Sequence, residues 1–308
     1  MIQPIKKEIL LESGTNELEV LELGITTDKE QCFGINVAKV REITAPQKVS
    51  KLPHSHPHIS GLILMRNEIL PVINLPRVLG LREELAWNEG SFIVTEFNEM
   101  KVVFHVGWVN QIHRISWERI EKPSEMLQSG GSLVGVIKLE NKMIMLLDFE
   151  KIVVDINPDT GINVNRLNHV AIRQERESKR ILIAEDSGIL RKLLEETLAK
   201  AGYLQHHIFQ DGKQAWEYLL ELSSQHKENI QDQVHLLITD IEMPQMDGLH
   251  LTKKVKEHEH LQRIPVVIFS SLISESLKHK GEAVGANAQI TKPQIDTLVK
   301  TLDKLILS

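Results

Sequence analysis

Carboxylates, a hydroxyl and a lysine follow apolar segments in the C-terminal half of the chain. Glu185 and Asp186 end RILIAED, Asp240 ends HLLITD, Ser270 ends VVIFS and Lys292 ends AQITK. Clustered carboxylates repel one another and resist ionisation unless a cation lies among them. Oxygen ligands at such a density favour a hard divalent ion, and Mg²⁺ fits best. If these residues meet in space, they predict a site for phosphoryl transfer to a carboxylate.

Asp240 is the candidate nucleophile, because it ends the middle strand of the sheet that we expect. Lys292 supplies a positive charge for a phosphoryl group or for Asp240, and Ser270 supplies a hydroxyl donor. Each position alone also has an ordinary structural explanation. An aspartate after a strand is commonly a turn residue, and Asp186 with the next serine could cap a helix. The combination, in this order along the chain, favours the site.

The segments around these residues alternate between strand and helix patterns. GILRKLLEETLAKAG, for example, has apolar residues at helical spacing, and Gly202 is its expected C-terminal stop. Five strands and five helices in the last part of the chain indicate a parallel sheet with strand order 2-1-3-4-5 and helices on both faces. The functional crevice of such a sheet lies outside the carboxyl ends of its strands, so the chemical residues should converge there.

The N-terminal half has β character instead. Its segments are short, rich in Val and Ile, and separated by Gly, Pro, Asn and Asp. The expected strands are residues 18–25, 32–40, 69–75, 91–97, 101–109, 132–139 and 142–149. Strands of this length and spacing favour one or two antiparallel barrels.

A change of composition separates the two halves. Apolar periodicity fades after the last of these strands, in a stretch with Pro, Gly and several Asn that ends in a charged run. We expect an N-terminal domain at residues 1–158, a linker at 159–178 and a C-terminal domain at 179–308.

Composition limits the classes of partner. The 308 residues include 36 basic and 42 acidic side chains, for a net charge of −6, so no basic surface for nucleic acid is expected. Cys32 is the only cysteine, which excludes an internal disulfide and favours a reducing compartment. The sequence shows no signal peptide and no apolar run near the roughly 20 residues of a spanning helix. These features predict a cytoplasmic protein with protein or small-molecule partners and no direct membrane insertion.

Residues 180–305 resemble the response-regulator receiver domain, which has a flavodoxin-like (βα)5 fold. The motifs that carry the resemblance are Glu185-Asp186, Asp240 in DIEMPQMDG, Ser270 and Lys292-Pro293. The resemblance implies that a sensor histidine kinase donates a phosphoryl group to Asp240.

The same resemblance implies roles for the other residues. The implied Mg²⁺ site consists of Glu185, Asp186, Asp240 and Glu242, the last through its main-chain carbonyl. Ser270 and Lys292 would sense the phosphoryl group and move toward it. That movement would shift the surface of the fourth helix, fifth strand and fifth helix of the domain.

One position departs from the receiver pattern. Three residues before Lys292, many receivers carry Tyr or Phe, which turns inward upon phosphorylation, whereas this chain has Gln289. The departure leaves Ser270 as the residue expected to respond to the phosphoryl group.

The N-terminal half resembles the chemotaxis adaptor family of the CheW type. The matching stretches are FGINVAKVREI (33–43), ISGLILMRNEILPVINLPRVLGL (59–81) and SLVGVIKLENKMIMLLDFEKIV (132–153). The resemblance implies an all-β domain with double SH3-like five-stranded barrels and no catalytic residues. Val37, Gly61 and Arg66 match positions tied to partner binding in that family. Each of the three also has an ordinary explanation as a core or turn residue.

An adaptor domain in front of a receiver resembles the CheV-type chemotaxis coupling proteins. The resemblance implies an adaptor, not an enzyme, that links chemoreceptors to the chemotaxis histidine kinase. Phosphorylation of Asp240 would modulate the coupling, for adaptation or as a phosphate sink. One alternative is a response regulator with an unfamiliar output domain, which the acidic balance disfavours if that output is DNA binding. The other is an aspartyl-phosphate hydrolase, which needs a second Asp where this chain has Glu242.

Overall fold

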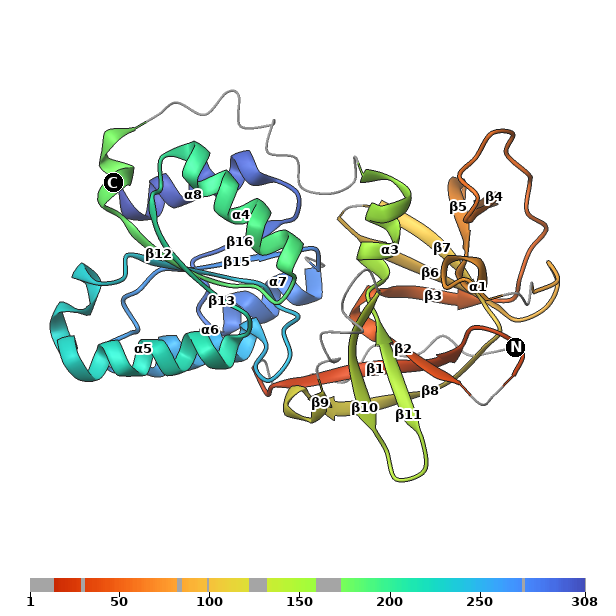
Figure 1. Ribbon diagram of the computed structural model, residues 1–308, viewed down its shortest axis with the longest axis horizontal. Coiled ribbons are helices and arrows are strands. Elements are labelled where there is room, and N and C mark those ends of the chain that lie inside the picture. Colours follow the sequence, from red (N-terminus) through yellow and green to blue (C-terminus); the bar gives the residue numbers. More distant parts are fainter. Residues whose placement is uncertain are drawn as a thin grey trace.

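The chain folds into a strand-rich N-terminal unit and an α/β C-terminal unit (Figure 1). The computed structural model describes residues 14–28, 31–81, 85–98, 100–121, 132–158, 173–272 and 275–307. Within these ranges, no helix has both the length and the apolar character needed to cross a membrane.

Two sheets build the N-terminal unit. The first contains, in order, β8 (Trp108–Ser116), β1 (Glu17–Gly24), β2 (Cys32–Asn36), β11 (Met143–Leu147), β10 (Leu133–Lys138) and β9 (Ile120–Glu121). The second contains, in order, β3 (Val40–Thr44), β6 (Ser91–Phe97), β7 (Met100–Val106), β5 (Glu68–Asn74) and β4 (Ile59–Met65). Both sheets are mixed, because β2 pairs with β11 and β5 pairs with β7 in parallel, while the other pairings are antiparallel. The double SH3-like barrel stays a prediction.

Two segments that we expected to be single strands each serve both sheets. Residues 32–40 leave β2 at Asn36, whose side chain accepts a hydrogen bond from the Ala38 amide and starts the 3-10 turn η1 (Val37–Lys39). The chain then enters β3 of the other sheet. Residues 101–109 break at Gly107, where a Cβ would lie 1.8 Å from the carbonyl oxygen of Thr26. These local breaks allow the two sheets to share one core.

That core contains inward-facing residues of both sheets together with the helix α3 (Phe149–Ile156). Asp148 caps α3 by accepting a hydrogen bond from the Lys151 amide at 2.9 Å. Phe149 is fully buried and packs edge-on against Phe104 of β7, with ring centroids 4.8 Å apart. Phe149, Ile152 and Val153 form the buried side of the helix, which leaves Glu150 free to face the C-terminal unit.

The C-terminal unit has a parallel five-stranded sheet in the expected 2-1-3-4-5 order. Its strands are, in spatial order, β13 (Gln205–Phe209), β12 (Arg180–Ala184), β14 (Leu236–Thr239), β15 (Val266–Ser270) and β16 (Ala288–Thr291). Its helices are α4 (Gly188–Ala201), α5 (Gly212–His226), α6 (Gly248–Glu257), α7 (Glu275–Ala283) and α8 (Ile295–Ile306). Side chains of α4 and α8 pack on one face of the sheet, and those of α5 and α6 pack on the other.

Part of the predicted linker packs against the C-terminal unit. Residues 159–172 lie outside the described residues, but the 3-10 helix η5 (Gln174–Ser178) carries the buried Arg176. The Arg176 guanidinium donates to both carboxylate oxygens of Asp303 in α8, at 2.8 and 2.7 Å. It also donates to the Ala201 carbonyl at 2.7 Å. Through these bonds, Arg176 holds η5 against the C-terminal ends of α4 and α8.

Candidate functional site

The carboxyl edge of the parallel sheet gathers the residues that the sequence singled out. Glu185, Asp186 and Asp240 each offer a carboxylate oxygen, and these oxygens lie within 4.8 Å of one another. Lys292 Nζ lies 2.8 Å from Glu185 Oε2 and 3.0 Å from Asp240 Oδ2. Ser270 ends the adjacent strand, where its carbonyl accepts a hydrogen bond from the Lys292 amide at 3.1 Å. The spatial convergence that we expected is present.

Burial makes it costly for the carboxylates at this edge of the sheet to carry negative charge. Glu185 is 1% exposed, and burial raises its pKa to about 7 although Lys292 acts in the opposite direction. Burial also raises the pKa of Asp186 well above its usual range, with further contributions from Glu185 and Asp240. The pKa of Lys292 is raised because Asp240 and Glu185 outweigh the effect of burial. Lys292 pairs with two of these three clustered carboxylates, and an all-oxygen donor set of this kind fits Mg²⁺.

A tight loop behind β14 fixes the position of Asp240. The Asp240 amide donates to the Ala184 carbonyl at 3.0 Å, and Asp240 Oδ1 accepts from the Ile241 amide at 2.6 Å. The loop closes where the Gly248 amide donates to the Ile241 carbonyl at 2.9 Å. A Cβ on Gly248 would lie 1.7 Å from the Asp240 carbonyl oxygen, so this close approach requires glycine. The Asp-Gly pair after the strand therefore serves to hold Asp240.

The acidic pair is held by the first turn of α4. Ser187 is the N-cap, and its Oγ accepts from the Leu190 amide at 3.4 Å. Glu185 Oε1 accepts from the Ser187 amide at 3.2 Å. The Arg191 guanidinium donates to the carbonyls of Glu185 and Asp186, at 2.9 and 2.7 Å. This loop therefore contains both the N-cap of α4 and two of the clustered carboxylates. Arg191 holds the main chain of the loop in place, and the sequence did not reveal this role.

Comparisons with known proteins agree with this geometry. A family model of the CheW-like domain matches residues 23–157, and a model of the response regulator receiver domain matches residues 181–303. The chemotaxis protein CheV3 of Helicobacter pylori is 29% identical over 283 residues, which cover 90% of this chain and 89% of that protein. CheV2 of the same organism is 27% identical over 321 residues, which cover 99% of this chain and all of that protein.

The chain joins a CheW-like domain to a receiver domain, the architecture of CheV-type chemotaxis proteins. Both resemblances expected from the sequence are confirmed, and this architecture does not favour either alternative. Among solved structures, the scaffolding protein TtCheW of Thermoanaerobacter tengcongensis is 23% identical, with a TM-score of 0.39. That match covers 42% of this chain and 88% of that chain.

Glu242 faces the CheW-like domain with its side chain. Glu242 Oε1 accepts from Asn36 Nδ2 at 2.6 Å, and Glu242 Oε2 pairs with Lys39 Nζ at 2.7 Å. Within the described ranges, its carboxylate does not belong to the group of three that is close enough to share one ion. The predicted metal contact uses its main-chain carbonyl instead, and it stays a prediction.

Gln289 joins strand β16 of the receiver domain to helix α7. Its Nε2 donates to the Lys278 carbonyl at 2.8 Å. Its Oε1 is buried and has no hydrogen-bond partner among the described residues. Gly281 makes room for this amide, because a Cβ there would lie 2.3 Å from Gln289 Cδ. The residue at the usual aromatic position is thus tethered to the helix by a polar contact.

The three predicted partner-binding residues lie in different local settings. Val37 is partly buried and packs against the shared core. Gly61 has φ +146°, and a Cβ there would lie 2.2 Å from the Ser50 carbonyl oxygen, so this position requires glycine for structural reasons. Arg66 is exposed in the turn between β4 and β5, where it forms an ion pair with Glu42.

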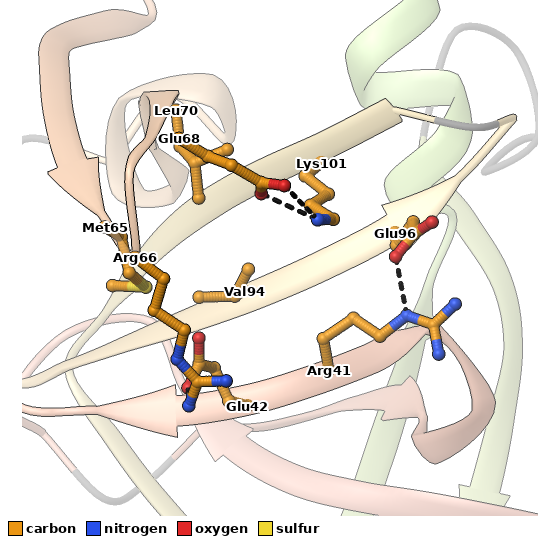
Figure 2. Close-up of a pocket in the computed structure, with 9 residues that line it drawn as sticks. All are labelled: Arg41, Glu42, Met65, Arg66, Glu68, Leu70, Val94, Glu96 and Lys101. Carbon is orange, nitrogen blue, oxygen red and sulfur yellow. Dashed lines mark hydrogen bonds and ion pairs between the residues drawn. The ribbon is translucent and has the colours of Figure 1, made fainter.

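Arg66 also lines a surface pocket of the second sheet. Figure 2 shows this pocket, which is formed by Arg41, Glu42, Met65, Arg66, Glu68, Leu70, Val94, Glu96 and Lys101. Arg41 pairs with Glu96 and Lys101 pairs with Glu68 across its surface. Leu64 and Ile69, on either side of the β4–β5 turn, are 67% and 69% exposed. The combination of exposed apolar and paired charged side chains suits a protein partner.

Sequence reasoning missed a set of residues that join the two domains. These residues are Asn16, Asn36, Lys39, Asn98, Trp117, Glu150, Gln245 and Ser271. Their polar groups meet across separations of more than a hundred residues, and no local pattern signals such a contact. Only the proximity of Glu242 and Ser271 to site residues in the sequence hinted at a role.

Proposed function

We propose that this protein is a chemotaxis coupling adaptor that is regulated by phosphorylation. Its CheW-like domain would link chemoreceptors to the chemotaxis histidine kinase, and that kinase would phosphorylate Asp240. The observation that carries the proposal is the gathering of three carboxylates and Lys292 at the strand ends of a receiver domain that follows a CheW-like domain. A cytoplasmic location belongs to the proposal, and the free Cys32 is in keeping with it.

The receiver site would hold Mg²⁺ through Asp186, Asp240 and the main-chain carbonyl of Glu242, with Glu185 beside them. Bound Mg²⁺ would supply positive charge that offsets the carboxylates and the incoming phosphoryl oxygens. The raised pKa values of Glu185 and Asp186 support this assignment, because they show that the site resists carrying its full negative charge.

Asp240 would act as the nucleophile. An Asp240 carboxylate oxygen forms a bond to phosphorus while the bond from phosphorus to the donor's imidazole nitrogen breaks. The electron pair of the broken bond stays on that nitrogen. Lys292, which pairs with Asp240 Oδ2 before the reaction, is placed to pair with a phosphoryl oxygen afterwards. Ser270 would then donate its hydroxyl, which now accepts from the Leu272 amide at 3.3 Å.

The CheW-like domain would bind its partners without chemistry of its own. Arg66 and the pocket in Figure 2 are the exposed part of the predicted contact set. Val37 and Gly61 would act by shaping the surface. Two sheets that share one core support a double SH3-like barrel. The domain limits of 1–158 and 179–308 around a linker at 159–178 stay predictions, and the end of that linker, at Gln174–Ser178, packs against the receiver domain.

Two measurements on the full chain test the proposal. Incubation with the phosphorylated kinase and Mg²⁺ should label the wild-type protein, and Asp240→Asn should abolish the label. Both proteins should co-sediment equally with membranes that contain receptor and kinase, whereas Arg66→Ala should reduce co-sedimentation. If the wild-type protein accepts no phosphoryl group, or if neither protein co-sediments, the proposed function is wrong.

A further inference from the structure

The CheW-like domain covers the rim of the proposed phosphorylation site. Lys39 of η1 is buried between two carboxylates, with its Nζ 2.9 Å from Glu150 Oε1 and 2.7 Å from Glu242 Oε2. Glu150 belongs to the same domain, whereas Glu242 belongs to the receiver domain, two residues after Asp240. Asn36 Nδ2 donates to the other oxygen of Glu242, Oε1, at 2.6 Å. One receiver carboxylate is therefore fully engaged by the partner domain.

A second contact reaches the neighbouring strand end. Ser271, which follows Ser270, donates its hydroxyl to Glu150 Oε1 at 2.5 Å. Its carbonyl accepts from the Asn98 amide at 3.3 Å. We call Asn36, Lys39, Glu150, Glu242 and Ser271 the interdomain latch. Both receiver members of the latch lie within two residues of the residues that would carry or sense the phosphoryl group.

The loop between β14 and α6 carries further contacts. The Gln245 amide donates to the Trp117 carbonyl at 3.3 Å, and Asn16 Nδ2 donates to the Gln245 carbonyl at 3.0 Å. The Asp247 amide donates to Asn16 Oδ1 at 2.9 Å. The same short loop that holds Asp240 on the receiver side is thus held by the CheW-like domain along its length.

The charges on the two sides of this boundary are coupled. Lys39 is the one cation in the latch, and it already serves Glu150 and Glu242. A phosphoryl group on Asp240 would replace the single negative charge of the carboxylate by about two, so about one further negative charge would lie beside this acidic rim. The added charge would repel the carboxylates of Glu150 and Glu242. The expected movement of Ser270 toward the phosphoryl group would also displace its neighbour Ser271, so both effects would weaken the latch.

We propose that the interdomain latch couples domain docking to the phosphorylation of Asp240, so that phosphorylation opens the latch and the closed latch slows phosphorylation. This inference rests on the proposed function, because it takes Asp240 as the phosphoacceptor. Linkage makes the coupling between the phosphorylated state and the open state reciprocal in free energy, whereas the effect of the closed latch on the rate of phosphorylation is a separate, kinetic consequence. Opening would also uncover η1, which carries Val37 beside Lys39.

The amide of Asn98 gives a direct measure of docking. It lies in the CheW-like domain, outside the phosphorylation site, and its hydrogen bond crosses to the Ser271 carbonyl of the receiver domain. Hydrogen exchange of this amide in the full chain should be slow with Mg²⁺ alone. It should become at least about fivefold faster after treatment with acetyl phosphate, which is the low end of typical coupling between sites. Mass spectrometry of the same samples records how much protein is phosphorylated.

Lys39→Met tests the reverse direction. The substitution removes the cation between Glu150 and Glu242, so the latch should open without phosphorylation. Asn98 should then exchange fast, and labelling by acetyl phosphate should be about fivefold faster or more. The matched control is Lys138→Met, which removes an exposed ion pair with Glu121 in the same domain and should behave as the wild type. Ser271→Ala, a smaller change, should act in the same direction as Lys39→Met and decides the matter if that variant does not fold.

The outcomes separate the two proposals. If the wild-type protein takes up no phosphoryl group, the proposed function fails. If phosphorylation is complete but Asn98 exchanges as before, the latch is refuted while the proposed function stands. A labelling rate for Ser271→Ala and Lys39→Met equal to that of the wild type would also refute the latch.

Discussion

Replacing Glu185 by Gln should stabilise the receiver domain at pH 8. Glu185 is almost completely buried, and its pKa of about 7 already includes the favourable effect of Lys292. The charged form is therefore costly in the folded protein even with its partner in place. Gln keeps the shape of the side chain and an oxygen that can still accept from Lys292, but it does not carry the charge.

The magnitude follows from the pKa values. The ordinary value for this group is 4.5, and the folded value is about 7. At about 1.36 kcal/mol per pH unit, the rise corresponds to about 3 kcal/mol. Because the folded pKa is the higher one, the contribution of Glu185 to stability is fully present below pH 4.5 and is lost as the pH rises through 7. The stability difference between variant and wild type should grow over that window.

Urea titrations with hydrogen exchange resolved for β12 and β14 would measure this in the full chain. Following these strands alone isolates the receiver domain, which matters because a two-domain chain need not unfold in one step. The variant should gain about 3 kcal/mol over the wild type at pH 8 and almost nothing near pH 4.5. Glu121→Gln, an exposed carboxylate paired with Lys138, should show no such difference.

Magnesium should narrow the difference in stability between the two proteins. The wild-type protein should gain about 2.7 kcal/mol at a Mg²⁺ concentration of one hundred times its Kd. Glu185→Gln should gain less, because one of the clustered carboxylates is gone. If the variant is no more stable than the wild type at pH 8 without Mg²⁺, then attraction to Lys292 outweighs burial and the reasoning is wrong.

Three further substitutions test other parts of the structure. In Gly248→Ala, the new Cβ would collide with the Asp240 carbonyl and displace the loop. The rate of phosphorylation should fall at least about tenfold, which is equivalent to about 1.4 kcal/mol, and a labelling time course would measure it. Asp303→Ala should destabilise the receiver domain by about 3–5 kcal/mol in urea, since it leaves Arg176 buried without its carboxylate partner. Arg66→Ala should change the free energy of unfolding by less than about 0.5 kcal/mol, because the side chain is exposed, and lose partner binding in co-sedimentation.

The receiver site could be predicted from sequence because its signals are local. Each strand is a short apolar run, and each chemical residue follows its strand directly. Parallel topology then places all the strand ends at one edge. The position of Asp240, Glu185 and Lys292 needed no information beyond this rule.

The sheets of the CheW-like domain were less predictable. The apolar pattern continues through residues 32–40, although the chain turns at Asn36 from one sheet to the other. The capping bond of Asn36 decides the break, and a hydrophobic pattern does not register such a bond. Parallel pairings such as β2 with β11 join strands more than a hundred residues apart, so the sequence order of hairpins does not reveal them.

The interdomain contacts were the least predictable feature. We expected phosphorylation to act through the surface of α7, β16 and α8. That expectation stays a prediction, while the hydrogen bonds between the described parts of the two domains lie at the loops after β14 and β15 and at the start of α6. Charged residues on solvated turns and charged residues in an interface have the same sequence pattern, so only the structure distinguishes them.

The β14–α6 loop therefore has two functions that compete for one conformation. On one side it holds the Asp240 carboxylate, and in the proposed Mg²⁺ site it would also offer the main-chain carbonyl of Glu242. On the other side it presents the Glu242 carboxylate to Lys39 and its main chain to Asn16 and Trp117. The close approach of Gly248 to the Asp240 carbonyl restricts the conformation of the loop. A change in the contacts on one side of the loop would therefore disturb the contacts on the other side. A phosphoryl group on Asp240 would need the loop to adjust, and the hydrogen bonds of 2.6–3.3 Å that hold the loop would weaken as their geometry changed. Coupling between phosphorylation and docking follows from this shared loop without a separate signalling element.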